Sequence, residues 1–92
     1  MIINILTSTL YEKQLKEILD SIIQHDLETA KQFKIYLDTI ILNMQTKEKK
    51  YKKSIYFDNE DIKDISFQGC TIIFFVDKSN SSYILLGITA KS

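Results

Sequence analysis

Arginine, proline and tryptophan are absent from this chain of 92 residues, and it has only one cysteine and two glycines. All 12 basic residues are therefore lysines, so no side chain can clamp a phosphate or carboxylate with the planar fork of a guanidinium. The single cysteine, Cys70, cannot form an internal disulfide, which fits the reducing cytosol. A fold stapled by disulfides is thereby excluded.

Long apolar runs are also missing. Residues 1–6 are apolar, but they lack the basic region and the long hydrophobic stretch of a signal peptide. No run approaches the roughly 20 apolar residues that a helix needs to span a bilayer. We therefore expect a soluble, cytoplasmic protein that has no membrane partner.

The charges balance overall but are unevenly placed. The formal net charge at pH 7 is zero and the sequence pI is about 6.6, which does not indicate a strongly basic nucleic-acid binder. Hydrophobic residues make up 45% and charged residues 26%, so residues 1–92 can form one globular domain with a single core. The lysines gather in one stretch, and acidic residues follow it: Lys47, Lys49, Lys50, Lys52, Lys53, then Asp58, Glu60, Asp61, Asp64.

Helical periodicity dominates the first half of the chain, after a β-branched run over residues 2–7 that predicts a strand. Thr9 and Glu12 have the spacing of a capping box, which predicts that a helix opens at Thr9 and stops near His25. Asp26 is the expected N-cap of a second helix. The two predicted buried stripes are Leu15, Ile18, Leu19, Ile22, Ile23 and Ala30, Phe33, Leu37, Ile40, Ile41, Met44. The short connection predicts an antiparallel helix hairpin.

The second half alternates with the period of a strand. Ile55 and Phe57 predict one strand, and Ile65 and Phe67 predict the next. Gln68-Gly69 is typical of a tight hairpin turn. Residues 71–76 form a nearly continuous apolar strand and residues 83–88 the last strand. The predicted order is β-α-α-β-β-β-β, an α+β fold with a helix hairpin on one face of a mostly antiparallel sheet.

The same frame resembles the RelE/ParE superfamily of toxins from type II toxin–antitoxin systems, and more closely the ParE-like branch. The resemblance covers nearly the whole chain, and it rests on the order and spacing of these pieces: Ser8, Tyr11 to Ile18, Ala30, Phe33, Tyr51 to Ile55, Ile62 to Ile65, Gly69, Val76-Asp77 and Ile84 to Ile88.

The resemblance implies a growth-inhibiting toxin, of the kind that serves plasmid stabilisation, neutralised by a cognate antitoxin protein. ParE-like members bind and inhibit DNA gyrase, and RelE-like members cleave messenger RNA, usually on the ribosome. A degenerate module that binds the antitoxin without toxicity is a third possibility. The antitoxin is expected to contact the outer edges of the helix hairpin or an exposed strand edge. No cofactor and no metal are implied.

The residues of the RNA-cleaving members are largely missing. Cleavage by a 2′-hydroxyl needs a proton acceptor, a proton donor and cations at the phosphate. The last strand carries Leu85 and Leu86 where the cleaving members tend to carry arginine, and the only histidine, His25, lies in the turn between the predicted helices. If the chain is an RNase, its candidate residues are Lys52, Lys53, Lys63 and Tyr56. We favour a protein without catalytic activity.

The lysine stretch is the candidate contact surface for gyrase, nucleic acid or an acidic antitoxin tail, or else a solvated linker between helix and sheet. The candidate binding residues are Lys49, Lys50, Lys52, Lys53 and Lys63. Lys63 stands where the family often has arginine on the sheet, so it is either an anchor for a carboxylate or an exposed strand lysine. Cys70 is expected to be an inert structural thiol, because a catalytic one wants a histidine neighbour.

Overall fold

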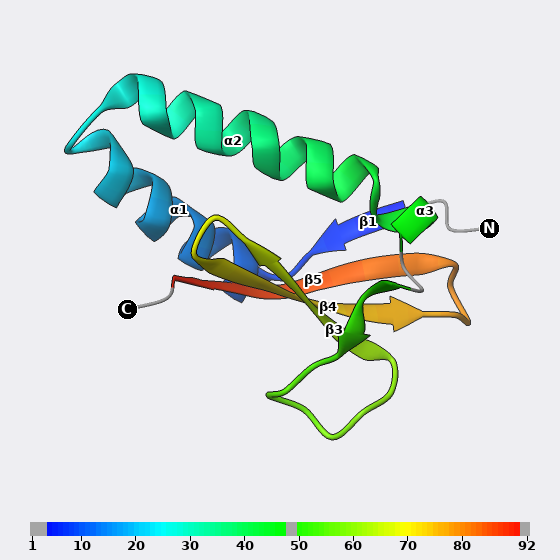
Figure 1. Ribbon diagram of the computed structural model, residues 1–92. Helices are drawn as coiled ribbons and strands as arrows, with labels where there is room; N and C mark the ends of the chain where they lie inside the picture. The colour runs from blue at the N-terminus through cyan, green and yellow to red at the C-terminus, as the bar shows by residue number, and fades with distance from the viewer. Residues whose placement is uncertain (1–3, 48–49, 91–92) are drawn as a thin grey trace.

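The computed structural model describes residues 4–47 and 50–90 (Figure 1). A short strand, β1 (Asn4–Thr7), leads into helices α1 (Thr9–Ile23) and α2 (Leu27–Leu42) and a single turn, α3 (Met44–Lys47). Strands β2 (Lys52–Lys53), β3 (Ile62–Phe67), β4 (Cys70–Asp77) and β5 (Ser82–Ala90) complete the chain. The expected α+β order is confirmed, with α3 as an addition.

All five strands belong to one sheet, in the order β1-β5-β4-β3-β2. The last three strands in sequence are joined by hairpins and pair antiparallel, whereas β1 pairs parallel with β5. After the helix hairpin, the chain enters the sheet again at β2, which is the edge strand opposite β1. The following strands lead back across the sheet until β5 lies parallel to β1. The expected strand over residues 2–7 is confirmed for residues 4–7; Ile2 and Ile3 lie outside the described residues.

The helix hairpin covers one face of the sheet and leaves the other face open (Figure 1). The core lies between these layers, and its fully buried side chains include Leu37 of α2, Phe74 of β4 and Tyr83 of β5. Burying a side chain of this size contributes on the order of 2 kcal/mol to stability. Both predicted helical stripes pack against this core with one exception, since the side chain of Ile23 is 46% exposed at the end of α1. No helix in the described ranges is long and apolar enough to cross a bilayer.

The start of α1 differs from the prediction. Ser8, rather than Thr9, is the N-cap: its Oγ accepts the backbone N–H of Tyr11 at 3.0 Å and donates to the carbonyl of Leu86 at 2.9 Å. The bond to Leu86 explains why Ser8 is the cap, because it joins the start of the helix to β5, whereas Thr9 is exposed. The capping box of Thr9 and Glu12 was therefore wrong by one residue.

The second helix starts as expected and ends early. Asp26 caps α2 by accepting the N–H of Glu28 at 3.0 Å and the hydroxyl of Thr29 at 2.7 Å. α2 ends at Leu42, with Asn43 as its C-cap, so Met44 belongs to α3 although it is buried as predicted.

The strand expected at Ile55 and Phe57 was wrong. The chain pairs with β3 through Lys52 and Lys53, the backbone N–H of Ser54 still donates to the carbonyl of Ile62 at 2.7 Å, and residues 54–57 belong to no strand. The loop begins because the N–H of Tyr56 bonds the Oγ of Ser54 at 3.1 Å and the N–H of Ile55 bonds Oδ2 of Asp64 at 3.1 Å. These side-chain acceptors replace the ladder partners that a strand would need. Two of the lysines thus form an edge strand, not a linker.

The hairpin between β3 and β4 turns at Gln68-Gly69 as expected. Both residues have positive φ, 44° and 78°, which is the conformation of a tight two-residue hairpin turn. A bulge interrupts the next pair: Phe74 faces Leu85 and Ile73 faces Gly87, so Leu86 is an extra residue. The bulge lets both Leu85 and Ile88 enter the core, and it presents the Leu86 carbonyl to Ser8.

Candidate functional site

A pocket of about 650 Å³ lies on the open face of the sheet, next to the edge strand β2. Three lysines and two tyrosines surround it: Lys50, Lys52, Lys53, Tyr51 and Tyr56. Ile55 and residues of β3, β4 and β5 complete the lining: Asp64, Ile65, Ser66, Thr71, Thr89 and Ala90. Its volume is in the range of sites that hold a ligand or part of a partner chain.

The floor of this pocket is set by strand register. Lys52 stands opposite Asp64, and the next row crosses three strands from Ser66 through Thr71 to Thr89. Thr71 alternates with the core residues Cys70 and Ile72, so this row faces away from the helices. The floor is therefore a line of hydroxyl groups with a lysine and a carboxylate at one end.

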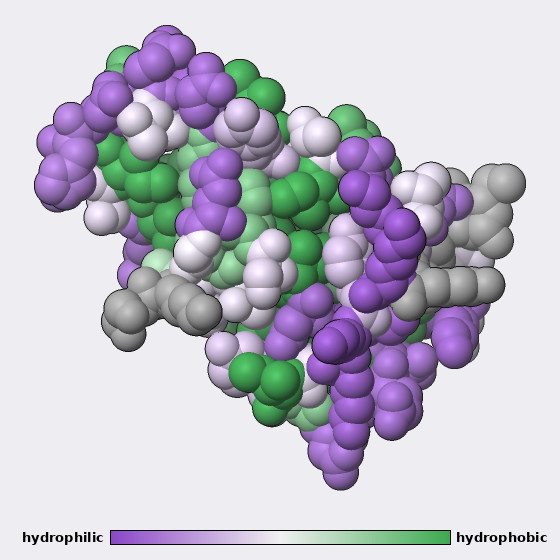
Figure 2. Space-filling view, viewed as in Figure 1, coloured by the Kyte–Doolittle hydropathy of each residue, from purple (hydrophilic) through white to green (hydrophobic). Residues whose placement is uncertain are grey.

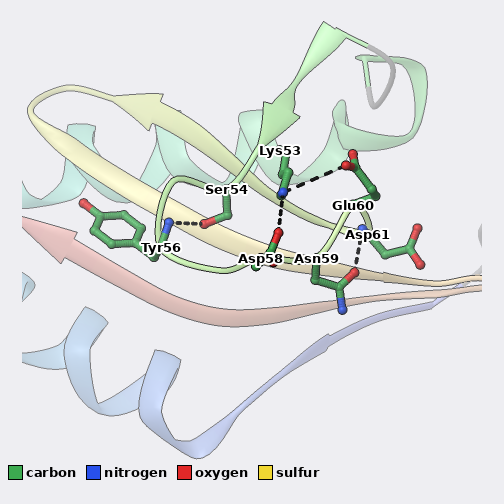
Figure 3. Close-up of polar contacts among 7 residues, drawn as sticks. All are labelled: Lys53, Ser54, Tyr56, Asp58, Asn59, Glu60 and Asp61. Carbon is green, nitrogen blue, oxygen red and sulfur yellow. Dashed lines mark hydrogen bonds and ion pairs between the residues drawn. The ribbon is translucent and has the colours of Figure 1, made fainter.

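Ile55 and Tyr56 form a wall of the pocket, and they belong to the loop 54–61, which projects below the sheet (Figure 1) and is held by its own polar contacts (Figure 3). The Nζ of Lys53 lies 2.8 Å from Asp58 Oδ1 and 3.9 Å from Glu60 Oε1, and the N–H of Asp61 bonds Asn59 Oδ1 at 2.8 Å. These contacts give the loop a fixed shape, so its outward side chains are held ready for a partner.

The loop exposes three consecutive large hydrophobic side chains. Ile55, Tyr56 and Phe57 are 84%, 55% and 44% exposed. Figure 2 shows hydrophobic surface at the loop below the sheet, surrounded by hydrophilic surface. A contiguous run of this kind, rimmed by charges, marks an interaction site more often than scattered single residues do.

Asp64 connects the floor and the wall. Its Oδ2 accepts the N–H of Ile55, which fixes the start of the loop, while its Oδ1 is buried and has no hydrogen-bond partner among the described residues. A buried acceptor without a partner costs free energy that a donor could recover. Asp64 is therefore the polar anchor of this region.

The ion pair with Asp58 keeps Lys53 in its charged form. Its hydrogen bond and charge interaction with Asp58 raise the pKa of Lys53, and the same contact lowers the pKa of Asp58. Both groups stay ionised at neutral pH, so neither exchanges a proton easily. Burial raises the pKa of Tyr51, which keeps its phenol protonated. No histidine lines the pocket, and no ion pair holds Lys50 or Lys52 within residues 4–47 and 50–90. The arrangement favours binding over proton transfer.

The sequence predicted some of the residues that line the pocket but not all of them. The structure brings together Lys50, Lys52, Lys53 and Tyr56, but Lys63 stands opposite Phe74 and so faces the helix side of the sheet, away from the pocket. Lys49 lies outside the described residues. Ile55 was not predicted as an exposed wall residue, and neither were Ser66, Thr71 and Thr89 as lining residues, although these polar side chains alternate with apolar ones along their strands.

The other reactive side chains lie elsewhere. His25 is exposed in the turn between α1 and α2. Cys70 is buried, lines a second pocket of about 550 Å³ beside Ile18, Ile22 and Phe33, and has its pKa raised by burial. The described residues contain no group of three or more side chains suited to a metal ion.

Similarity to known proteins is found in the fold and not in the sequence. Searches against protein-family models and curated proteins found no match. Among solved structures, a chain described as the "Chromosomal ParDE TA system from P. aeruginosa" superimposes with a TM-score of 0.74. The match covers 99% of this chain and 98% of that chain at 11% identity. The fold expected from the resemblance to RelE/ParE toxins is thereby confirmed.

Proposed function

We propose that this chain is the toxin of a type II toxin–antitoxin system, that it is ParE-like, and that it inhibits DNA gyrase by binding it. A cognate antitoxin protein neutralises it. The observation that carries the proposal is the fold match with a chain of the chromosomal ParDE TA system, which spans nearly all of this chain and of that one. The sequence frame supports the same family independently.

The pocket supports a mechanism by binding rather than by catalysis. Its cations are lysines, one of them already held by Asp58, and no side chain with an ordinary pKa near neutrality lines it. A toxin that blocks its target by occupying a surface needs only shape, apolar contact area and charge. The exposed Ile55, Tyr56 and Phe57 supply that contact area.

One observation favours a second candidate, a RelE-like messenger RNA endoribonuclease. Lys50 and Lys52 with Tyr56 at the edge of a sheet-face pocket could bind a phosphate backbone and stack a base. Against it stand the missing histidine and arginine, because lysine cannot clamp a phosphate in the bidentate way.

Induction of the protein in growing bacteria separates these candidates. We expect growth to stop, plasmid DNA to lose negative supercoiling, and messenger RNA to stay intact in the first minutes. Rapid fragmentation of messenger RNA with normal plasmid topology would replace the proposal with the RNase. Unimpaired growth at full expression would leave only a non-toxic module that binds an antitoxin.

A further inference from the structure

Helix α2 carries a second row of large apolar side chains, on a side of the helix that does not pack on the core. Leu27, Ile35 and Leu42 are 54%, 59% and 78% exposed. Their spacing places them on one face, because an α-helix has 3.6 residues per turn. Figure 1 shows α2 as the outermost helix, above α1 and the sheet. An exposed apolar row in this position indicates contact with another molecule.

Two opposite charges lie in the same row. Lys31 is exposed, and no ion pair holds it among the residues that the structure describes. The side chain of Asp38 is 54% exposed, and its Oδ1 lies 2.6 Å from Nζ of Lys34. Lys31 and Asp38 are two helical turns apart and so share a face. From Leu27 to Leu42 the row is therefore apolar, basic, apolar, acidic and apolar.

This row is complementary to itself when two copies of α2 lie antiparallel. A two-fold axis between residues 34 and 35 sets Leu27 of one copy opposite Leu42 of the second, because both are equally far from the axis along the helix. For the same reason Lys31 lies opposite Asp38 of the second copy, and the two Ile35 side chains meet at the axis. A wholly acidic or wholly basic partner would meet a like charge at Asp38 or at Lys31, whereas a second copy meets neither.

We infer that this row is the interface of a homodimer, in which α2 of one copy packs antiparallel on α2 of a second copy. The inference goes beyond the proposed function and does not depend on it. Lys34 stays paired with Asp38 of its own chain, so each Asp38 receives one cation from each copy. Three apolar side chains per copy make a small interface, so we expect a reversible dimer that dissociates on dilution.

Analytical ultracentrifugation of the purified full chain over a wide range of protein concentrations tests the inference. Ile35→Ser removes the apolar side chain that lies at the axis. Ile23→Ser is the matched control, because it makes the same change at the end of α1, where the side chain is 46% exposed. We expect Ile35→Ser to weaken the dimer at least roughly tenfold, since both copies lose the contact, and Ile23→Ser to leave it unchanged.

A charge exchange tests the antiparallel register. Lys31→Glu or Asp38→Lys alone puts like charges opposite each other at two symmetric places, so each should weaken the dimer roughly tenfold. Both substitutions in one chain restore opposite charges and should restore the dimer. Lys13→Glu is the control for the change in net charge, since Lys13 is exposed on α1. Recovery in the double variant separates the interface from damage to the fold.

Three outcomes would overturn the inference. They are a protein that stays monomeric at the highest concentration, a dimer that site and control variants weaken equally, and a double charge variant as weak as the single ones. Growth arrest by a monomeric protein would remove this inference and leave the proposed function standing. A dimer with the expected variant pattern but without growth arrest would do the reverse.

Discussion

At the scale of single residues, Ser8 is the position where local chemistry and tertiary structure meet. Its hydroxyl accepts from Tyr11 N–H and donates to the Leu86 carbonyl, so one atom caps α1 and joins it to β5. The sequence predicted Thr9 as the cap, whereas the structure places Ser8 there and adds a second hydrogen bond, between residues 78 apart in the chain.

Ser8→Ala is expected to lower the free energy of unfolding by about 2 kcal/mol, because both a cap and a long-range hydrogen bond are lost. Thr9→Ala is the matched control and should change it by less than about 0.5 kcal/mol, since Thr9 is exposed and is not the cap. Urea denaturation of both variants measures the difference. Equal losses would contradict the assignment of the cap.

Tyr11 gives a pH-dependent prediction. Its ring is 2% exposed and its hydroxyl has no hydrogen-bond partner among the described residues. Burial and, to a lesser extent, the charge of Asp38 raise its pKa from 10.0 to about 12. As pH rises above 10 the unfolded chain loses this proton first, so the contribution of Tyr11 to stability is complete below pH 10 and is lost as pH approaches 12.

Tyr11→Phe should therefore flatten the fall in stability between pH 10 and about 12, and raise stability near pH 7 by about 1 kcal/mol by removing an unpaired buried hydroxyl. Thermal melts over this pH range provide the measurement. Tyr36→Phe, at a position 51% exposed, is the control and should change neither. A Tyr11→Phe protein with the wild-type pH profile would show that the hydroxyl is solvated.

At the scale of elements, the bulge in β5 determines how α1 lies on the sheet. Two residues after Leu86 in β5, the N–H of Ile88 donates to Oε1 of Gln14 in α1 at 3.0 Å. The same oxygen would lie 2.8 Å from a Cβ on Gly87, so this strand position tolerates no side chain while Gln14 is in place. Glycine here permits a close approach between helix and strand.

A double-mutant cycle tests this contact. Gly87→Ala alone should lower the free energy of unfolding by about 1 kcal/mol, because the Gln14 side chain must move and its hydrogen bond is lost. In a Gln14→Ala background the same change should be neutral or stabilising, as alanine in a strand costs less conformational entropy than glycine. Additive effects in the cycle would show that the two residues do not interact.

The elements also show what the sequence could predict. Helical spacing located α1 and α2, and Gln68-Gly69 located the β3–β4 turn, because each signal is local. The strand at Ile55 and Phe57 was predicted from alternation alone. It does not form because Ser54 and Asp64 bind the loop backbone, and Asp64 is nine residues away from Ile55 in the chain. The alternation of residues 54–57 does not show that these side chains will accept the backbone N–H groups that a strand would use.

At the scale of the whole molecule, the order of elements followed from the sequence, but the site did not. The parallel pairing of β1 with β5 and the bulge at Leu86 are non-local, and together with the register of β2 they decide which face each side chain occupies. Lys52 and Lys63 were predicted as members of one set of binding residues, yet the register puts them on opposite faces of the sheet. The candidate pocket is thus a product of strand register.

The proposal that this protein inhibits gyrase by binding it is tested most directly by a supercoiling assay with purified protein. Gyrase is incubated with relaxed plasmid, ATP and the protein in stoichiometric excess, with heat-denatured protein as the control. The account predicts that supercoiling stops with the native protein and continues in the control. Full supercoiling at the highest excess of native protein would contradict it.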